Sequence, residues 1–267
     1  MVVTDRDWHL PGLFWSYGLA AVLVFSFLAP ATRELWNSLD IGLAYGFNSW
    51  VASNALAQRL WAVANLRVID YIAAIFLCSL LLCYGLFGRN AWALERAARL
   101  IVLCAALLAV VALTRAFVFD DISRDSPSLV LEPFTRLSEQ VDFAVKDHSP
   151  KSFPGDHATV VAVFTFLLWF FAGPRYGLVS ALLAALLVLP RLVSGAHWTT
   201  DVVVGGVGTA LVTVPMVIFT PLQLYAVAWT AKGLNRIVCR CALFSSRSGP
   251  TGPGRERARP GNGSRTP

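Results

Sequence analysis

Long apolar runs are the feature that most constrains how this chain can fold. They lie at residues 13–30, 68–87, 98–118, 157–172, 177–193 and 201–223. Several approach the length of about 20 residues that a helix needs to cross a bilayer. Only 14% of the 267 residues are charged, whereas soluble domains average roughly 25%. The runs therefore predict an all-α, polytopic membrane bundle of about six transmembrane helices.

The first apolar run has a second interpretation, because "APA" at 29–31 resembles the cleavage site of a signal peptide. The segment before the run holds two aspartates against one arginine, whereas a signal peptide begins with a positively charged region. The run is also long. An uncleaved first span is therefore preferred.

Basic connectors predict the orientation of the bundle. The short connectors at 88–99 and 173–177 are basic, and so is the chain from Lys232 onward. Cytoplasmic loops carry an excess of lysine and arginine. Both termini are therefore expected in the cytoplasm, with the longer connectors 31–67 and 119–156 on the far face.

The chain divides into a membrane domain, residues 1–235, and a basic tail, residues 236–267. The end of the tail is rich in Gly, Pro, Ser and Arg and is expected to be disordered. Such a tail is attracted to anionic membrane lipids, although a solvated segment that enforces topology is the simpler interpretation. No motif supports nucleic-acid binding.

The two far-face connectors are expected to hold interfacial helices. Segment 31–67 is rich in aromatic residues and predicts two amphipathic helices on the membrane surface. In segment 119–156, apolar residues recur at intervals of three and four, which predicts a helix with Pro133 in its first turn. These residues are Phe134, Leu137, Val141 and Ala144. Both connectors could be membrane anchors, or they could form a lid over a lipid headgroup.

The stretch "PRLVSGAHWTTD" at 190–201 carries the first group of polar residues. His197 and Asp201 are four residues apart, so a helix would place them on one face, carboxylate beside imidazole. An aspartate that holds one ring nitrogen leaves the other free as a base or nucleophile. Arg191 lies six residues before His197, and a turn at Gly195 can bring the two together.

The stretch "SFPGDHA" at 152–158 carries the second group. Asp156 is a good N-cap for the apolar run that follows, and His157 then falls in the first helical turn. The free N–H groups of a helix start favour an anion. A lone histidine there is more often a structural cap. However, membrane spans exclude such groups unless they are paired or functional, so both stretches together indicate an active site.

These residues resemble motifs of the type 2 phosphatidic acid phosphatase superfamily, over roughly residues 10–235. Arg191, His197 and Asp201 match the spacing of its third motif, and Pro154 to His157 resembles its second. "RDSPSL" at 124–129 resembles a version of the first motif. Together, these variants look most like the branch that transfers phosphate from undecaprenyl diphosphate to lipid A.

The resemblance implies a role for each motif residue. His197 would attack the terminal phosphorus of a lipid diphosphate, Asp201 would orient it, and His157 would protonate the departing lipid phosphate. Arg191 and Arg124 would neutralise charge on the phosphoryl oxygens. No carboxylate cluster is placed for Mg²⁺, so neither a metal nor another cofactor is expected.

The motifs also depart from the superfamily pattern. Ser126 stands at the place of the first-motif arginine, and Gly155 at that of the second-motif serine. Further phosphate-site residues are therefore expected beside the two arginines: Lys146, Lys151 and Asp156, the last turned away as a helix cap.

The resulting prediction is a multi-pass phosphotransferase of the bacterial inner membrane, with its site at the periplasmic surface. Its donor would be undecaprenyl diphosphate and its acceptor lipid A. One alternative is a hydrolase of the same fold that acts on undecaprenyl diphosphate or phosphatidylglycerol phosphate. Another is a lipid-binding or transport protein with an inactive site.

Overall fold

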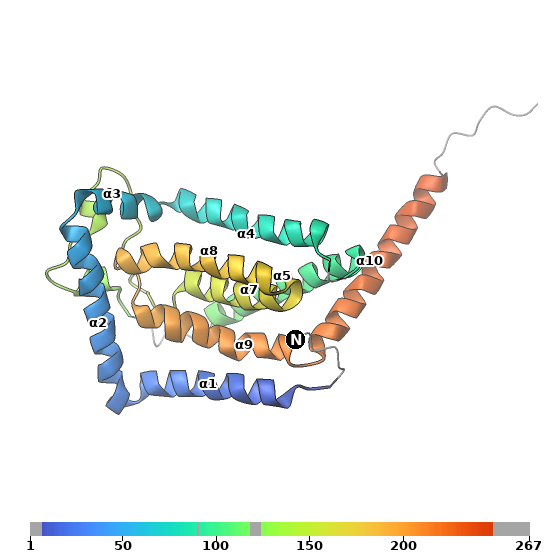
Figure 1. Cartoon of the computed structure of the whole chain (residues 1–267), viewed down its shortest axis with the longest axis horizontal. Coiled ribbons are helices and arrows are strands. Elements are labelled where there is room, and N and C mark those ends of the chain that lie inside the picture. The colour runs from blue at the N-terminus through green and yellow to red at the C-terminus, as the bar shows by residue number, and fades with distance from the viewer. Residues whose placement is uncertain (1–6, 90, 118–123, 248–267) are drawn as a thin grey trace, which may run out of the picture.

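The computed structural model describes residues 7–89, 91–117 and 124–247, and this part of the chain is helical without β-strands. Six roughly aligned spans form the bundle (Figure 1). The spans are α1 (Leu10–Leu28), α4 (Arg67–Phe87), α5 (Ala93–Phe117), α7 (Asp156–Ala172), α8 (Pro174–Val193), and η2 (Asp201–Val207) continued by α9 (Gly208–Ile218).

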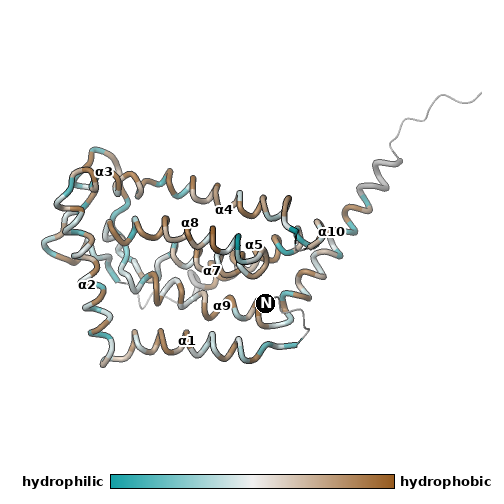
Figure 2. Tube along the Cα trace, viewed as in Figure 1, coloured by the Kyte–Doolittle hydropathy of each residue, from teal (hydrophilic) through white to brown (hydrophobic). Residues whose placement is uncertain are grey.

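Five of these spans are long and apolar enough to cross a membrane, and α7, with 17 residues, is shorter. The predicted bundle of about six spans is thus confirmed. Helix α7 is the central one, since it contacts α5, α8, η2 and α9. A helix surrounded by others is apolar on all sides. Across the bundle, hydrophobic residues run along the spans while hydrophilic ones gather at the ends (Figure 2).

The two connectors at one end of the bundle differ in structure. The first forms α2 (Pro30–Ala52) and α3 (Ala55–Ala64), which confirms the two predicted helices. Helix α2 runs across the end of the bundle, nearly perpendicular to the spans (Figure 1). The start of α1 and α10 (Leu222–Arg247) lie at the opposite end. The boundary proposed at residue 235 falls inside α10, and the tail residues 248–267 lie outside the described residues.

The helix predicted around Pro133 is wrong. Between residues 124 and 155, the described part of the second connector, the only helices are the short α6 (Pro127–Val130) and η1 (Leu137–Glu139). The Asn48 side chain donates to the carbonyl of Thr135 at 2.8 Å and accepts from its N–H at 3.0 Å, so these groups bond to α2 instead of to a helix of their own.

The lid suggested for this connector loses its basis for the same reason. Leu137 is 1% exposed and packs among buried residues of α2, α3 and α8. The ring of Phe134 lies against Gly195. Leu137 is therefore not free to lie against lipid, and the connector is held against the bundle.

Two glycines of η2 allow it to lie close to the start of α7. A Cβ at Gly205 would lie 2.7 Å from the Pro154 Cβ, and one at Gly206 would lie 2.9 Å from the Ala158 Cβ. Both values are shorter than real Cβ contacts. The close approach brings the two polar stretches of the sequence together at one end of the bundle.

Replacing Gly206 by alanine is therefore expected to lower activity by about 100-fold, since a shift of about 1 Å at a reacting group has an effect of that size. Gly208→Ala is the matched control, because its Cβ would meet only Leu23 at 3.7 Å. Both changes add the same helix-favouring methyl group. Activity and thermal unfolding should be measured in detergent for both. Full activity in Gly206→Ala would show that the close approach is dispensable.

Candidate active site

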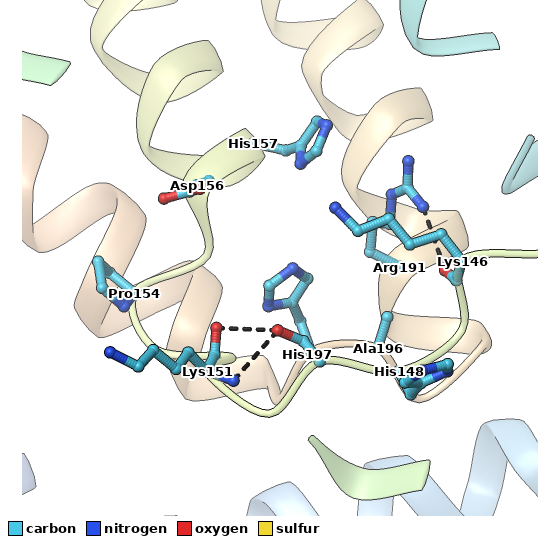
Figure 3. A pocket seen from close by; sticks show the side chains of 10 residues that line it. Lys146, His148, Lys151, Pro154, Asp156, His157, Arg191, Ala196 and His197 are labelled. Atoms are coloured by element: carbon cyan, nitrogen blue, oxygen red, sulfur yellow. Dashed lines mark hydrogen bonds between the residues drawn. The ribbon is translucent and has the colours of Figure 1, made fainter. Parts of the chain in front are cut away.

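A small pocket at the α2 end of the bundle collects most of the predicted site residues (Figure 3). The connector before α7, the start of α7, the end of α8 and the turn after it all contribute to its wall. The lining residues are Lys146, His148, Ser149, Lys151, Pro154, Asp156, His157, Arg191, Ala196 and His197. Of the predicted residues, Asp201 and Arg124 do not line it.

A tight turn carries His197 back to the end of α8. Gly195 has φ +76°, a left-handed conformation that suits glycine. The Arg191 carbonyl then accepts hydrogen bonds from the N–H groups of Ala196 at 3.0 Å and His197 at 3.2 Å. The predicted turn is confirmed, and it places Arg191 and His197 on the same pocket.

The Nδ1 atom of His197 has two acceptors nearby. The Ser152 carbonyl lies 2.9 Å away and the Asp201 carboxylate 3.5 Å away. A carbonyl oxygen can only accept a hydrogen bond, so Nδ1 carries the proton and a neutral ring has its lone pair on Nε2. The arrangement leaves Nε2 as the nucleophilic atom.

The expectation that His197 and Asp201 share a helix face is wrong, although they are near each other. His197 lies in the turn before the helix begins, whereas Asp201 is the first residue of η2. Asp201 is fully buried and accepts a 2.7 Å hydrogen bond from the Trp198 N–H. The carboxylate thus turns back over the loop toward the ring.

His157 lies in the first turn of α7, as predicted, but the helix cap differs. Gly155 is the N-cap residue and Asp156 the first residue of the helix. In Figure 3 the Asp156 carboxylate points away from His157, while the rings of His157 and His197 face a common space. The expected orientation of Asp156 is therefore observed, although it is not the cap.

Arg191 is held by a carboxylate that the sequence analysis missed. Its guanidinium donates two hydrogen bonds to Asp70, at 2.7 and 2.8 Å, and one to Asn65 at 3.1 Å. Asp70 also lies 3.7 Å from Nε2 of His157. It therefore links the two motifs. A carboxylate in the first turn of a membrane span was the available signal, because such groups are costly there unless paired.

The two lysines of the connector have different directions. The ammonium of Lys146 points into the space between Arg191 and His157, whereas the side chain of Lys151 extends toward Pro154 (Figure 3). The space that the His157 and His197 rings face is thus bordered also by the guanidinium of Arg191 and the ammonium of Lys146. This set suits a phosphate, because arginine and lysine are its usual protein partners.

Arg124 is placed behind the pocket. It binds the carboxylates of Asp40, at 2.8 Å, and Asp201, at 3.1 Å, and also hydrogen-bonds to the Thr200 hydroxyl. Its guanidinium lies 4.9 Å from the centre of the Trp198 ring. In this geometry Arg124 positions Asp201. Asp40 and Thr200, also missed in the sequence analysis, complete the network.

Within the described ranges, no group of three or more His, Cys, Asp or Glu side chains is arranged to hold a metal ion.

Comparison with known proteins identifies the family of the chain. Residues 100–224 match the PAP2 superfamily. Lipid A 1-diphosphate synthase of Escherichia coli (strain K12) is 31% identical to the chain over 220 residues, which cover 80% of this chain and 90% of the relative. No solved structure gives a significant match.

Proposed function

The chain belongs to the PAP2 superfamily and is an enzyme of lipid phosphate chemistry, and on that premise we propose a specific reaction for it. It transfers the terminal phosphate of undecaprenyl diphosphate to a phosphate of lipid A, through a phosphohistidine. The bundle of apolar helices makes it a membrane protein. We further propose that it resides in a bacterial inner membrane, with the pocket on the periplasmic side.

One observation carries the proposed chemistry: the Nε2 atom of His197 faces a pocket that also holds His157, Arg191 and Lys146. A nucleophile needs a free lone pair, a leaving group needs a proton, and a phosphate needs cations. The pocket supplies each of these from a separate side chain.

In the first step, Nε2 of His197 attacks the terminal phosphorus of the donor. The bond from this phosphorus to the bridging oxygen breaks, and His157 protonates the departing lipid phosphate. The Ser152 carbonyl and Asp201 hold the Nδ1 proton and stabilise the positive ring that develops. Arg191 and Lys146 balance the charge on the phosphoryl oxygens.

In the second step, an ionised phosphate oxygen of the acceptor attacks the phosphorus of the phosphohistidine. The phosphorus–Nε2 bond breaks, and its electron pair returns to His197. The choice of lipid A as acceptor is supported by the relative named above, which is 31% identical. The periplasmic location is supported by the basic connectors, which lie at the end opposite the pocket.

The test is a partition experiment. Purified protein receives undecaprenyl diphosphate labelled in its terminal phosphate, together with increasing lipid A. We expect label to move into lipid A and to exceed label in free phosphate at saturating acceptor. Lipid A stripped of its phosphates is the control acceptor and should take up no label.

Two results would contradict the transfer. Free phosphate that dominates at every lipid A concentration would support the hydrolase of the same fold. The absence of product from any lipid diphosphate would remove the donor as well.

A further inference from the structure

A second pocket lies beside the candidate active site and shares part of its wall. It is formed between the α3–α4 junction and the connector before α7. Lys146 and His148 line both pockets. The second pocket is completed by Asn65, Leu66, Arg67, Val68, Ala144 and Val145.

The ionisable groups that line this second pocket are those of Arg67, Lys146 and His148, and no carboxylate belongs to its wall. The acids nearest to these residues in sequence are Asp70, Asp142 and Asp147, and none of them lines the pocket. Asp147 is fully buried and accepts 2.7 Å from the Ser138 N–H and 3.1 Å from His148 Nδ1. Asp70 receives both hydrogen bonds of the Arg191 fork. Because His148 is paired with Asp147, the positive charge of the pocket comes from Arg67 and Lys146.

The other half of the pocket is apolar, and it opens at the level where a span ends. Leu66, Val68, Ala144 and Val145 supply the apolar part of its wall. Arg67 is the first residue of α4, and Val68 beside it is 52% exposed. A cationic pocket with an apolar side at a membrane boundary suits an anionic headgroup that carries lipid chains.

We propose that this second pocket holds the phosphorylated headgroup of the acceptor lipid, an inference that rests on the proposed transfer function. A transferase must bring two anionic lipids to one histidine. Lys146 and His148, shared by the two pockets, lie where both phosphates would meet. Arg67 lies on the acceptor side alone, since it does not line the pocket that holds His197.

The test variant is Arg67→Glu, which reverses the charge on the acceptor side. A glutamate at a helix start is favourable, so the fold should tolerate it. We expect the KM for lipid A to rise about tenfold or more, as for loss of a charged phosphate contact. Release of free phosphate from labelled donor without acceptor should stay unchanged.

Two further variants sharpen the measurement. Arg59→Glu makes the same charge change on the exposed surface of α3, outside both pockets. It should alter neither the KM for lipid A nor the release of free phosphate without acceptor. Arg67→Lys retains the charge and should keep most of the affinity for lipid A.

The outcomes separate the possibilities. A rise in the donor KM without acceptor would assign the pocket to the donor and overturn the inference. Normal transfer kinetics in Arg67→Glu would overturn it while leaving the proposed function intact. If the unmodified protein transfers no phosphate to lipid A, the proposed function fails and the inference falls with it.

Discussion

Replacing His197 by glutamine is expected to lower turnover by about 10⁴-fold or more, the scale seen when a catalytic nucleophile is removed. The reason lies in the Nδ1 proton, which the Ser152 carbonyl accepts at 2.9 Å. This contact leaves Nε2 as the attacking atom, and glutamine has no equivalent lone pair there. Steady-state turnover of labelled donor measures the loss.

The same variant also tests the covalent intermediate. Rapid quenching of the unmodified protein should trap a labelled phosphoenzyme that is labile to acid and stable to base. The variant should trap none. His9→Asn is the control, because His9 caps α1 at the opposite end of the bundle and asparagine is a good cap. A phosphoenzyme in the His197 variant would place the nucleophile elsewhere.

Replacing His157 by glutamine is expected to slow turnover by about 10²- to 10⁴-fold, the usual contribution of a general acid. The loss should depend on the leaving group, which the His197 defect should not. In the His157 variant, a lipid diphosphate, whose leaving lipid phosphate would now depart without a proton, should show a large defect. An aryl phosphate with a weakly basic leaving group should show a small one. The measurement is a series of turnover rates against leaving-group basicity.

An equal loss for all leaving groups would assign His157 to phosphate binding instead of proton transfer. The Asp70 carboxylate lies 3.7 Å from Nε2 of His157, so a change at His157 could also act through Asp70. This carboxylate also holds Arg191 through two hydrogen bonds. A change at His157 that disturbed Arg191 would raise the donor KM for every substrate alike.

The proposed acceptor pocket offers a reason why the enzyme would transfer phosphate to lipid instead of to water. A lid formed by the connector before α7 is not available to exclude water, because Leu137 is buried and Asn48 holds the connector through Thr135. Preference for lipid over water would then depend on occupancy of the second pocket. An acceptor phosphate held beside the phosphohistidine has a high effective concentration.

Features that depend on neighbours in the chain were predictable from sequence. Apolar runs predicted the spans, because crossing a bilayer requires only a sufficient length of apolar helix. Gly195 predicted the turn that returns His197 to Arg191, since a left-handed residue reverses the chain within a few positions. His157 was likewise predicted in the first helical turn from the residues just before it, although the cap is Gly155 and not Asp156.

The spacing between residues was a less reliable predictor of a helix, because a loop can bring the same two side chains together. The interval from His197 to Asp201 predicted a shared helix face, but the contact forms over a turn that starts the helix. The interval from Phe134 to Val141 likewise predicted a helix. There the backbone of Thr135 found a better partner in Asn48, which is 87 residues away.

Only the tertiary structure decided which charges meet. Arg191 and Asp70 are 121 residues apart, and Arg124 and Asp40 are 84 apart. Periodicity records which side of a helix is apolar, but it does not say which buried polar group on another helix will lie opposite. Packing of α4 beside α8 set the partner of Arg191. The sequence by itself thus determined the membrane bundle and the two histidine motifs, while long-range packing determined what orients the residues of the pocket and formed the second pocket beside it.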